Sequence, residues 1–323
     1  MKTCQVYLKP HDALLTGYCY ERDVVLPESE ARPAVLIFGG GAYKHIIAKE
    51  RDPIAMAYLH YGFNAFVLHY SVTEDSEGSP ITKEENVMQD ALEDAIAALT
   101  YIREHAKELN VDDKRIAVVG FSAGGNLALR LATLTDCKPN ALVLGYPAVE
   151  TVRGLTEEKR ILDHVDANTP PMFLFHTEYD SMVSPVNSLK LATRLVELEI
   201  PCEMHLFPTG DHGLALAIEN TGDRNRDVSK WLRMSVRFLQ NILSGKKLLW
   251  GDLAEQPLSL DTRDDILYHN EKVKPILEKY LGEKVEMLVE NPFFAYIPLR
   301  RFASLMQVDQ ATVNAIEKEL ENL

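Results

Sequence analysis

A serine between glycines stands at the junction of an apolar run and a helical pattern near the middle of the chain. Residues 120–124 read Gly-Phe-Ser-Ala-Gly; they follow the run at 116–119 and precede the helical stretch at 126–134. A turn this sharp puts its central residue in a strained backbone conformation, so the flanking positions must be small and the Ser122 hydroxyl stands exposed. The pattern therefore predicts a strand, a tight turn that carries a nucleophile, and a helix in direct succession.

Apolar runs and helical patterns alternate along the first 245 residues. Continuous apolar runs are typical of strands buried on both faces of a mostly parallel sheet, and they occur at 34–38, 65–68, 116–119, 141–144, 172–175 and 203–207. Residues 5–25 alternate polar and apolar side chains around a break at His11 and Asp12, which predicts antiparallel strands at a sheet edge. The chain is therefore expected to fold as a doubly wound α/β sheet flanked by helices.

One long amphipathic helix is predicted after residues 82–85. The sequence there, Thr-Lys-Glu-Glu, has capping-box spacing, and apolar residues recur at intervals of three and four from Leu92 to Leu109. A shorter helix is predicted from Pro53 to Tyr61, with Gly62 as its C-terminal stop.

The pattern changes near Ser244. Residues 246–323 contain no strand pattern and many helix formers, with a helical stripe at 266–281 and Asp309 placed to cap a last helix. Two domains are therefore expected: an α/β domain at 1–245 and a small, all-helical C-terminal extension at 246–323.

Charge and cysteine content exclude several classes of function. The formal net charge of −14 would repel nucleic-acid phosphates and anionic lipid headgroups, so neither nucleic acid nor a membrane is expected as a partner. The four cysteines are widely separated and none has the spacing of a zinc or redox site, so reduced thiols and no metal site are expected. The start of the chain lacks a signal-peptide core, and no stretch reaches the roughly 18 apolar residues of a membrane helix. The sequence therefore predicts a cytoplasmic protein.

A serine hydroxyl is a weak nucleophile at neutral pH, so a base must accept its proton. After a turn of this kind the partners follow in the chain order Ser, Asp or Glu, His. His212 is flanked by glycine on the segment after the run at 203–207, and Asp180 lies on the segment after the run at 172–175. Both positions follow the carboxyl ends of strands, where open α/β sheets place their sites, so His212 is predicted as the base and Asp180 as its orienting acid.

Other ionisable residues compete with these two. Glu178 and Asp211 are acids near strand ends, where carboxylates are often solvated, and Asp211 adjoins His212 in an extended loop, where neighbouring side chains diverge. His176 is expected to hydrogen-bond locally.

Three consecutive glycines follow the first buried strand. Residues 39–43 read Gly-Gly-Gly-Ala-Tyr, and a run of glycines of this kind favours close approach of the backbone to a ligand. Acyl transfer needs N–H donors aimed at the oxyanion that forms on the substrate carbonyl. One donor is expected from the backbone of Ala123, and the others from this glycine loop.

The motifs GGGAY, GFSAGG, HTEYDSMVSP and GDHGL occur in this order, and residues 1 to about 245 resemble the esterase and acetyl-esterase branch of the α/β-hydrolase superfamily. The chain is similar to bacterial acetyl xylan esterases and feruloyl esterases, which remove acyl groups from plant polysaccharides or their fragments. The resemblance implies an α/β-hydrolase fold with Ser122, Asp180 and His212 as catalytic triad and with Gly40, Gly41 and Ala123 as oxyanion-hole donors. The tail resembles a short helical module at the ends of some bacterial carbohydrate enzymes, and a packing or dimerisation role is expected for it.

The leading hypothesis is hydrolysis of small acyl esters, above all acetyl groups on sugars or oligosaccharides, through an acyl-serine intermediate. This chemistry requires no metal and no organic cofactor, and its partner is the ester substrate itself. Two alternatives stay open. One is a peptidase of the prolyl-oligopeptidase type, which uses the same turn on the same fold; the other is a binding protein built on a catalytically inactive hydrolase fold.

Overall fold

The structure is a computed structural model that describes residues 1–21, 31–150, 161–219, 224–244, 258–260, 262, 267–268, 270–282, 284–290 and 297–320. The chain divides into two compact units, Met1–Gly245 and Lys246–Leu323. Each unit has hydrophobic clusters of its own, and the first unit holds every site residue predicted from the sequence.

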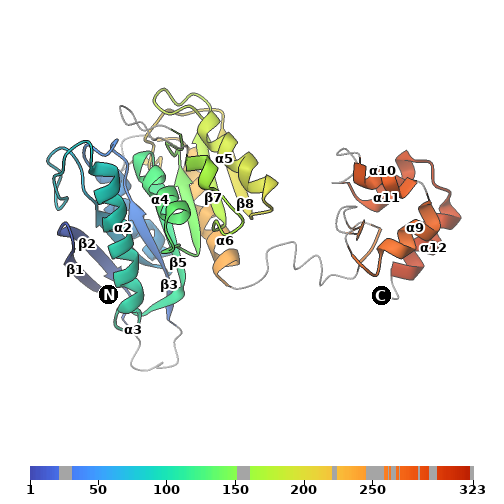
Figure 1. Ribbon diagram of the computed structural model, residues 1–323, viewed down its shortest axis with the longest axis horizontal. Coiled ribbons are helices and arrows are strands. Elements are labelled where there is room, and N and C mark those ends of the chain that lie inside the picture. Colours follow the sequence, from blue (N-terminus) through green and yellow to red (C-terminus); the bar gives the residue numbers. More distant parts are fainter. Residues whose placement is uncertain are drawn as a thin grey trace. The chain divides into compact units, whose positions relative to one another are not determined.

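Within the described residues, an eight-stranded sheet forms the centre of the first unit (Figure 1). Its strands are β1 (Lys2–Leu8), β2 (Ala13–Cys19), β3 (Arg32–Phe38), β4 (Asn64–His69), β5 (Val111–Phe121), β6 (Ala141–Gly145), β7 (Met172–Thr177) and β8 (Cys202–Phe207). They are ordered β1-β2-β4-β3-β5-β6-β7-β8. β2 pairs antiparallel with β1 and β4, and the remaining pairs of this sheet are parallel. The predicted mostly parallel sheet with an antiparallel edge is confirmed.

Helices cover both faces of this sheet. The helices of the first unit are α1 (Asp52–His60), α2 (Val87–Glu104), α3 (Ala106–Leu109), α4 (Ala123–Leu134), α5 (Val186–Glu197) and α6 (Trp231–Leu243), with short 3-10 turns η1 (Ala48–Glu50), η2 (Ile161–His164) and η4 (Val228–Lys230). Buried residues of α2, α4 and α5 belong to one hydrophobic cluster, and those of α1 and α6 belong to another.

Each central strand supplies side chains to both clusters. In β3, Leu36 and Phe38 join the cluster under α2, α4 and α5, whereas Val35 and Ile37 join the cluster under α1 and α6. Successive side chains of a strand point to opposite faces of the sheet, so a strand covered on both faces must be apolar throughout. This requirement explains the continuous apolar runs in the sequence.

The long helix differs from its prediction at both ends. It begins at Val87 and not beside Thr82, because the Thr82 hydroxyl donates to the side chain of Asp90 and does not cap a helix N-terminus. It ends at Glu104, and the apolar pattern continues in the short helix α3 after an interruption at His105. The capping-box prediction was therefore wrong, whereas the amphipathic character was right.

In the second unit the described elements are helices, namely α9 (Lys274–Leu281), α10 (Lys284–Glu290), α11 (Leu299–Leu305) and α12 (Gln310–Leu320). Leu277, Phe302 and Ile316 are among the buried members of its hydrophobic cluster. The predicted cap at Asp309 is present, since its carboxylate accepts from the backbone N–H of Thr312 at 2.9 Å. The start of the predicted stripe, at Ile266, lies outside the described residues.

None of the helices in the described part of the chain combines the length and the apolar character that a membrane crossing requires.

The turn between β5 and α4 is packed so closely that its glycines have no room for a side chain. A Cβ on Gly124 would lie 2.2 Å from the carbonyl oxygen of Phe38 and 2.5 Å from that of Gly39. These oxygens belong to the end of β3 and to the glycine loop, so α4 can start here only if residue 124 is glycine.

We expect Gly124→Ala to lower the free energy of unfolding by about 3 kcal/mol or more, because backbone atoms must move to make room. Gly62→Ala is a matched control: its φ of +88° strains alanine, but the nearest atom to a new Cβ is the flexible guanidinium of Arg32 at 3.3 Å. The control should cost about 1–2 kcal/mol. Urea unfolding of both variants measures these costs, and equal losses would contradict the steric explanation.

Candidate active site

Ser122 occupies the strained turn that the sequence predicted. Its backbone has φ 51° and ψ −116°, a conformation that L-residues rarely adopt. Hydrogen bonds from both sides hold it there: its N–H donates to the Gly145 carbonyl at 3.0 Å, and its carbonyl accepts from Asn126 and Ala148, each at 3.1 Å. The neighbouring strand and the first turn of α4 thus fix the position from which the hydroxyl projects.

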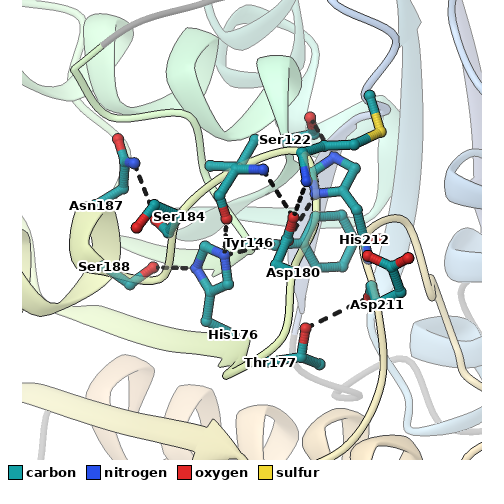
Figure 2. A network of polar contacts seen from close by, with 12 residues as sticks. Ser122, Tyr146, His176, Thr177, Asp180, Ser184, Asn187, Ser188, Asp211 and His212 are labelled. Atoms are coloured by element: carbon teal, nitrogen blue, oxygen red, sulfur yellow. Dashed lines mark hydrogen bonds and ion pairs between the residues drawn. The ribbon is translucent and has the colours of Figure 1, made fainter.

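The structure brings Ser122, His212 and Asp180 together in a continuous hydrogen-bonded chain (Figure 2). His212 Nε2 lies 2.9 Å from Ser122 Oγ, and His212 Nδ1 lies 2.7 Å from Asp180 Oδ2. The three residues follow the carboxyl ends of β5, β7 and β8, which meet at one edge of the parallel sheet. The His212 side chain is 10% exposed and that of Asp180 is fully buried.

Two backbone amides and two histidine rings surround the Asp180 carboxylate. Oδ1 accepts from the backbone N–H groups of Met182 at 2.9 Å and Val183 at 2.7 Å. Oδ2 faces His212 and also lies 3.2 Å from Nε2 of His176. Burial raises the pKa of Asp180, but the hydrogen bonds from His176, His212 and Val183 outweigh burial and hold that pKa well below its usual range. The carboxylate is thereby kept ionised beside the His212 ring.

His176 is a second histidine in contact with the acid. It is fully buried at the end of β7, with Nδ1 2.8 Å from Ser188 Oγ and Nε2 2.9 Å from the Val183 carbonyl. Because a carbonyl only accepts, Nε2 carries the proton and Nδ1 accepts from the Ser188 hydroxyl. The expected local hydrogen bonding is present, but the contact of its Nε2 with Asp180 was not predicted. The spacing of four residues across the strand end was the available signal.

The competing carboxylates lie elsewhere. Glu178 is exposed, and its backbone N–H donates to Phe207. Asp211 is also exposed, but its Oδ1 accepts from the backbone N–H groups of Ser181 at 2.8 Å and His212 at 2.7 Å. These bonds lower the pKa of Asp211 and connect the Asp180 loop with the His212 loop. Asp211 therefore bonds the histidine's backbone and not its ring.

The glycine loop lies directly against the nucleophile. A Cβ on Gly40 would come within 2.9 Å of both Ser122 Cβ and the Phe121 carbonyl oxygen. Gly41 has a φ of +134°, and a Cβ there would lie 1.9 Å from the His45 carbonyl oxygen. Close approach to other parts of the chain therefore explains the glycines at 40 and 41, whereas the sequence predicted close approach to a ligand.

The three predicted oxyanion donors differ in what they contact. The Ala123 N–H starts α4 and has no intrahelical acceptor, and within the described residues no acceptor is in hydrogen-bonding contact with it or with the Gly41 N–H. The Gly40 N–H, by contrast, donates to the buried Glu50 carboxylate at 2.6 Å. In this structure Gly40 is therefore engaged by Glu50, which the sequence did not single out.

Among the residues that the structure describes, no group of three or more His, Cys, Asp or Glu side chains is arranged to hold a metal ion.

Two family models match parts of the chain. The model of the alpha/beta hydrolase fold matches residues 85–168, and the model of the prolyl oligopeptidase family matches residues 145–245. Together these segments include Ser122, Asp180 and His212.

Solved structures match about three quarters of the chain. An α/β hydrolase enzyme, MGS-M1, from a Medee basin deep-sea metagenome library is 38% identical, with a TM-score of 0.67, over 76% of this chain and 98% of that chain. An acetyl ester-xyloside bifunctional hydrolase from Caldicellulosiruptor lactoaceticus is 30% identical, with a TM-score of 0.61, over 72% of this chain and 89% of that chain.

Curated relatives are longer than the matched region. Endo-1,4-beta-xylanase B of Butyrivibrio fibrisolvens is 33% identical over 63% of this chain, and the acetylxylan esterase of Xylanibacter ruminicola is 23% identical over 64%. The match spans 35% and 47% of those two proteins. The chain belongs to the α/β-hydrolase family, and its likeness within that family is to esterases.

The hydrogen bonds to Asp180 generate a pH dependence of stability. Because the pKa of Asp180 is lower in the folded chain than its ordinary value of about 3.9, the unfolded chain binds this proton more tightly. The stabilisation is complete above the ordinary pKa and is lost as the pH falls below it. We expect the free energies of unfolding of wild type and Asp180→Asn to differ by a constant amount above about pH 5 and to converge progressively as the pH falls below about 4. Urea unfolding across this pH range measures the difference, and a constant gap would contradict the explanation.

Proposed function

We propose that this chain is a serine carboxylic-ester hydrolase with Ser122 as nucleophile, His212 as general base and Asp180 as orienting acid. The observation that carries the proposal is the chain of contacts Ser122 Oγ–His212 Nε2–His212 Nδ1–Asp180 Oδ2, at 2.9 Å and 2.7 Å. It has the geometry that a serine nucleophile requires, since the base lies within hydrogen-bond reach of the hydroxyl and is itself oriented by a third group.

The chemistry follows from these contacts. Ser122 Oγ forms a bond to the ester carbonyl carbon while its proton passes to His212 Nε2. The resulting imidazolium is stabilised by the Asp180 carboxylate and returns the proton to the alkoxide leaving group as the tetrahedral intermediate collapses. Water then attacks the acyl-serine with the same base, which releases the carboxylic acid and restores Ser122.

Stabilisation of the oxyanion is assigned to the Gly41 and Ala123 N–H groups. Ala123 directly follows Ser122, Gly41 follows the Gly40 that lies against Ser122, and neither N–H has an acceptor among the described residues. Gly40, a third donor by family resemblance, would have to exchange its bond to Glu50 for one to the oxyanion. We therefore assign Gly40 the role of holding the loop. Removal of a single oxyanion donor costs about 10²–10³ in kcat, which sets the scale of what these amides contribute.

The substrate class is small acyl esters, with acetyl groups on sugars or oligosaccharides as the first choice. Support comes from two similar proteins, one named an acetyl ester-xyloside bifunctional hydrolase and the other an acetylxylan esterase. The reaction uses no metal or organic cofactor, because every step above is a proton transfer or an acyl transfer by the residues named.

A peptidase is the second candidate, because the prolyl oligopeptidase model matches residues 145–245. The same triad could attack a peptide carbonyl and form an acyl-serine intermediate. Comparison of p-nitrophenyl acetate with a prolyl p-nitroanilide separates the two: an esterase turns over the first far faster than the second, and the opposite preference would favour the peptidase.

For residues 246–323 we propose a packing or dimerisation role and no part in the chemical step. This unit has its own apolar cluster, and the proposed triad and oxyanion donors all precede it.

We expect Ser122→Ala to remove esterase activity, with a loss of about 10³ or more in kcat, and to leave urea unfolding close to that of wild type. The loss follows because alanine provides no nucleophile, whereas the backbone contacts of residue 122 are kept. A covalent adduct of wild type, but not of the variant, with an organophosphonate tests the same residue directly. Undiminished turnover of p-nitrophenyl acetate by the purified variant would overturn the assignment, and absence of an adduct with wild type would favour an inactive fold.

Among the three nearby carboxylates, only Asp180 should be essential for turnover. Asp180→Asn should lower kcat by about 10⁴, because the histidine loses its orienting carboxylate. Glu178→Gln should be close to wild type, and Asp211→Asn should be mild, because Asp211 bonds only backbone N–H groups of the two loops. The three variants assayed at one pH decide the matter: an Asp180→Asn enzyme within about tenfold of wild type, roughly 1.4 kcal/mol, would show that another acid orients His212.

A further inference from the structure

A buried carboxylate that the proposed mechanism does not use lies beside the active site. Glu50 is 2% exposed and ends the short turn η1 that precedes α1. Its two oxygens face different donors: Oε2 accepts from the Gly40 N–H at 2.6 Å, and Oε1 accepts from the Tyr146 hydroxyl at 2.7 Å. An ionised side chain is rarely buried unless its environment supplies such donors.

Tyr146 continues the contact toward the base. It follows β6 with a φ of 38° and is fully buried, and its hydroxyl accepts from the Ala215 N–H at 2.9 Å while it donates to Glu50. Ala215 lies three residues after His212 in the same loop. The Tyr146 ring also packs edge-on against the His212 ring, with centroids 4.9 Å apart and an interplanar angle of 63° (Figure 2).

These contacts form one continuous connection between two loops far apart in the sequence. The glycine loop is attached at Gly40, the His212 loop is attached at Ala215, and Glu50 and Tyr146 bridge them. Burial raises the pKa of Glu50, whereas the Tyr146 hydroxyl and the Gly40 N–H oppose that shift. Burying a carboxyl group is costly, and apolar residues of similar size often stabilise a fold as well or better. A positioning role at the active site would explain why a carboxyl group occupies this buried position.

We propose that Glu50 and Tyr146 are positioning residues that hold the glycine loop and the His212 ring in register around Ser122. This inference rests on the proposed function. The bond to Gly40 sets where the next amide, that of Gly41, is presented, and the Tyr146 ring limits how far the His212 ring can turn away from Ser122. A displacement of about 1 Å in such a group can cost about a hundredfold in rate.

Tyr146→Phe and Glu50→Gln test the connection with minimal change of shape. The first removes the bridging hydroxyl and keeps the ring against His212. The second leaves an amide that can accept from only one of the two donors. Each should lower kcat on p-nitrophenyl acetate by about tenfold to a hundredfold, leave KM nearly unchanged, and slow phosphonylation of Ser122 by a similar factor. The double variant should lose no more than the worse single variant, since both break one connection.

Tyr58→Phe is the matched control. Tyr58 is also fully buried in the first unit, its hydroxyl lies 2.7 Å from Ser235 Oγ, and its ring packs against Trp231 with centroids 6.5 Å apart. Its removal should lower the free energy of unfolding about as much as Tyr146→Phe does and leave kcat and phosphonylation at wild-type values.

Three outcomes are distinguishable. Loss of kcat in the two site variants but not in Tyr58→Phe supports the positioning role. Wild-type kcat in Tyr146→Phe and Glu50→Gln, or a loss that only follows stability across all three variants, overturns it and leaves the proposed function intact. A wild-type protein that neither hydrolyses esters nor forms a phosphonate adduct overturns the proposed function, and the positioning role with it.

Discussion

The contacts around Ser122 constrain the rest of the first unit. The residue is held in a strained conformation by hydrogen bonds to β6, to the segment after it and to the start of α4; Gly40 lies against Ser122, and the end of β3 lies against Gly124. A Cβ at Gly120 would lie 2.4 Å from the Gly124 carbonyl oxygen, so even the two flanking glycines touch each other's backbone. Backbone strain of this kind persists only where several independent contacts hold the residue in place. The parallel sheet supplies that support, because adjacent strands end side by side at the same edge.

Two buried carboxyl groups close to this turn have pKa values that are shifted in opposite directions. Asp180 receives donors from two backbone amides and two histidines, and its pKa falls despite burial. Glu50 receives two donors, and burial prevails, so its pKa rises. The difference follows from the deeper burial of Glu50 and from the additional hydrogen bonds to Asp180. It matches the roles proposed here, since the acid that faces the base must remain charged, whereas Glu50 serves to join two loops.

Aromatic side chains connect the site to the core beneath it. Tyr146 contacts His212 on one side and Phe175 on the other, with ring centroids 5.6 Å apart, and Phe175 stacks on Trp231 at 4.6 Å. The Trp231 indole N–H in turn donates to the Ala215 carbonyl at 2.8 Å, so the His212 loop is anchored from α6 as well as from β6. Rings of this size dominate the burial of apolar surface in a core. A polar site at the sheet edge can therefore be held by groups that also stabilise the fold.

The sequence by itself determined the strands, the fold class, the turn at Ser122 and the chain order of the residues that meet it, because periodicity, glycine and strand-end position are local properties. The sequence-based predictions were wrong where a group hydrogen-bonds to a partner that local patterns do not indicate. Thr82 bonds Asp90 and does not cap a helix, and the Gly40 N–H bonds the Glu50 carboxylate and is not free for the oxyanion. Tyr146 belongs to no motif, and His176 was expected only to hydrogen-bond locally. Their contacts join segments that only the closed sheet brings within hydrogen-bond distance, and that distance is set by packing, which a linear pattern does not record.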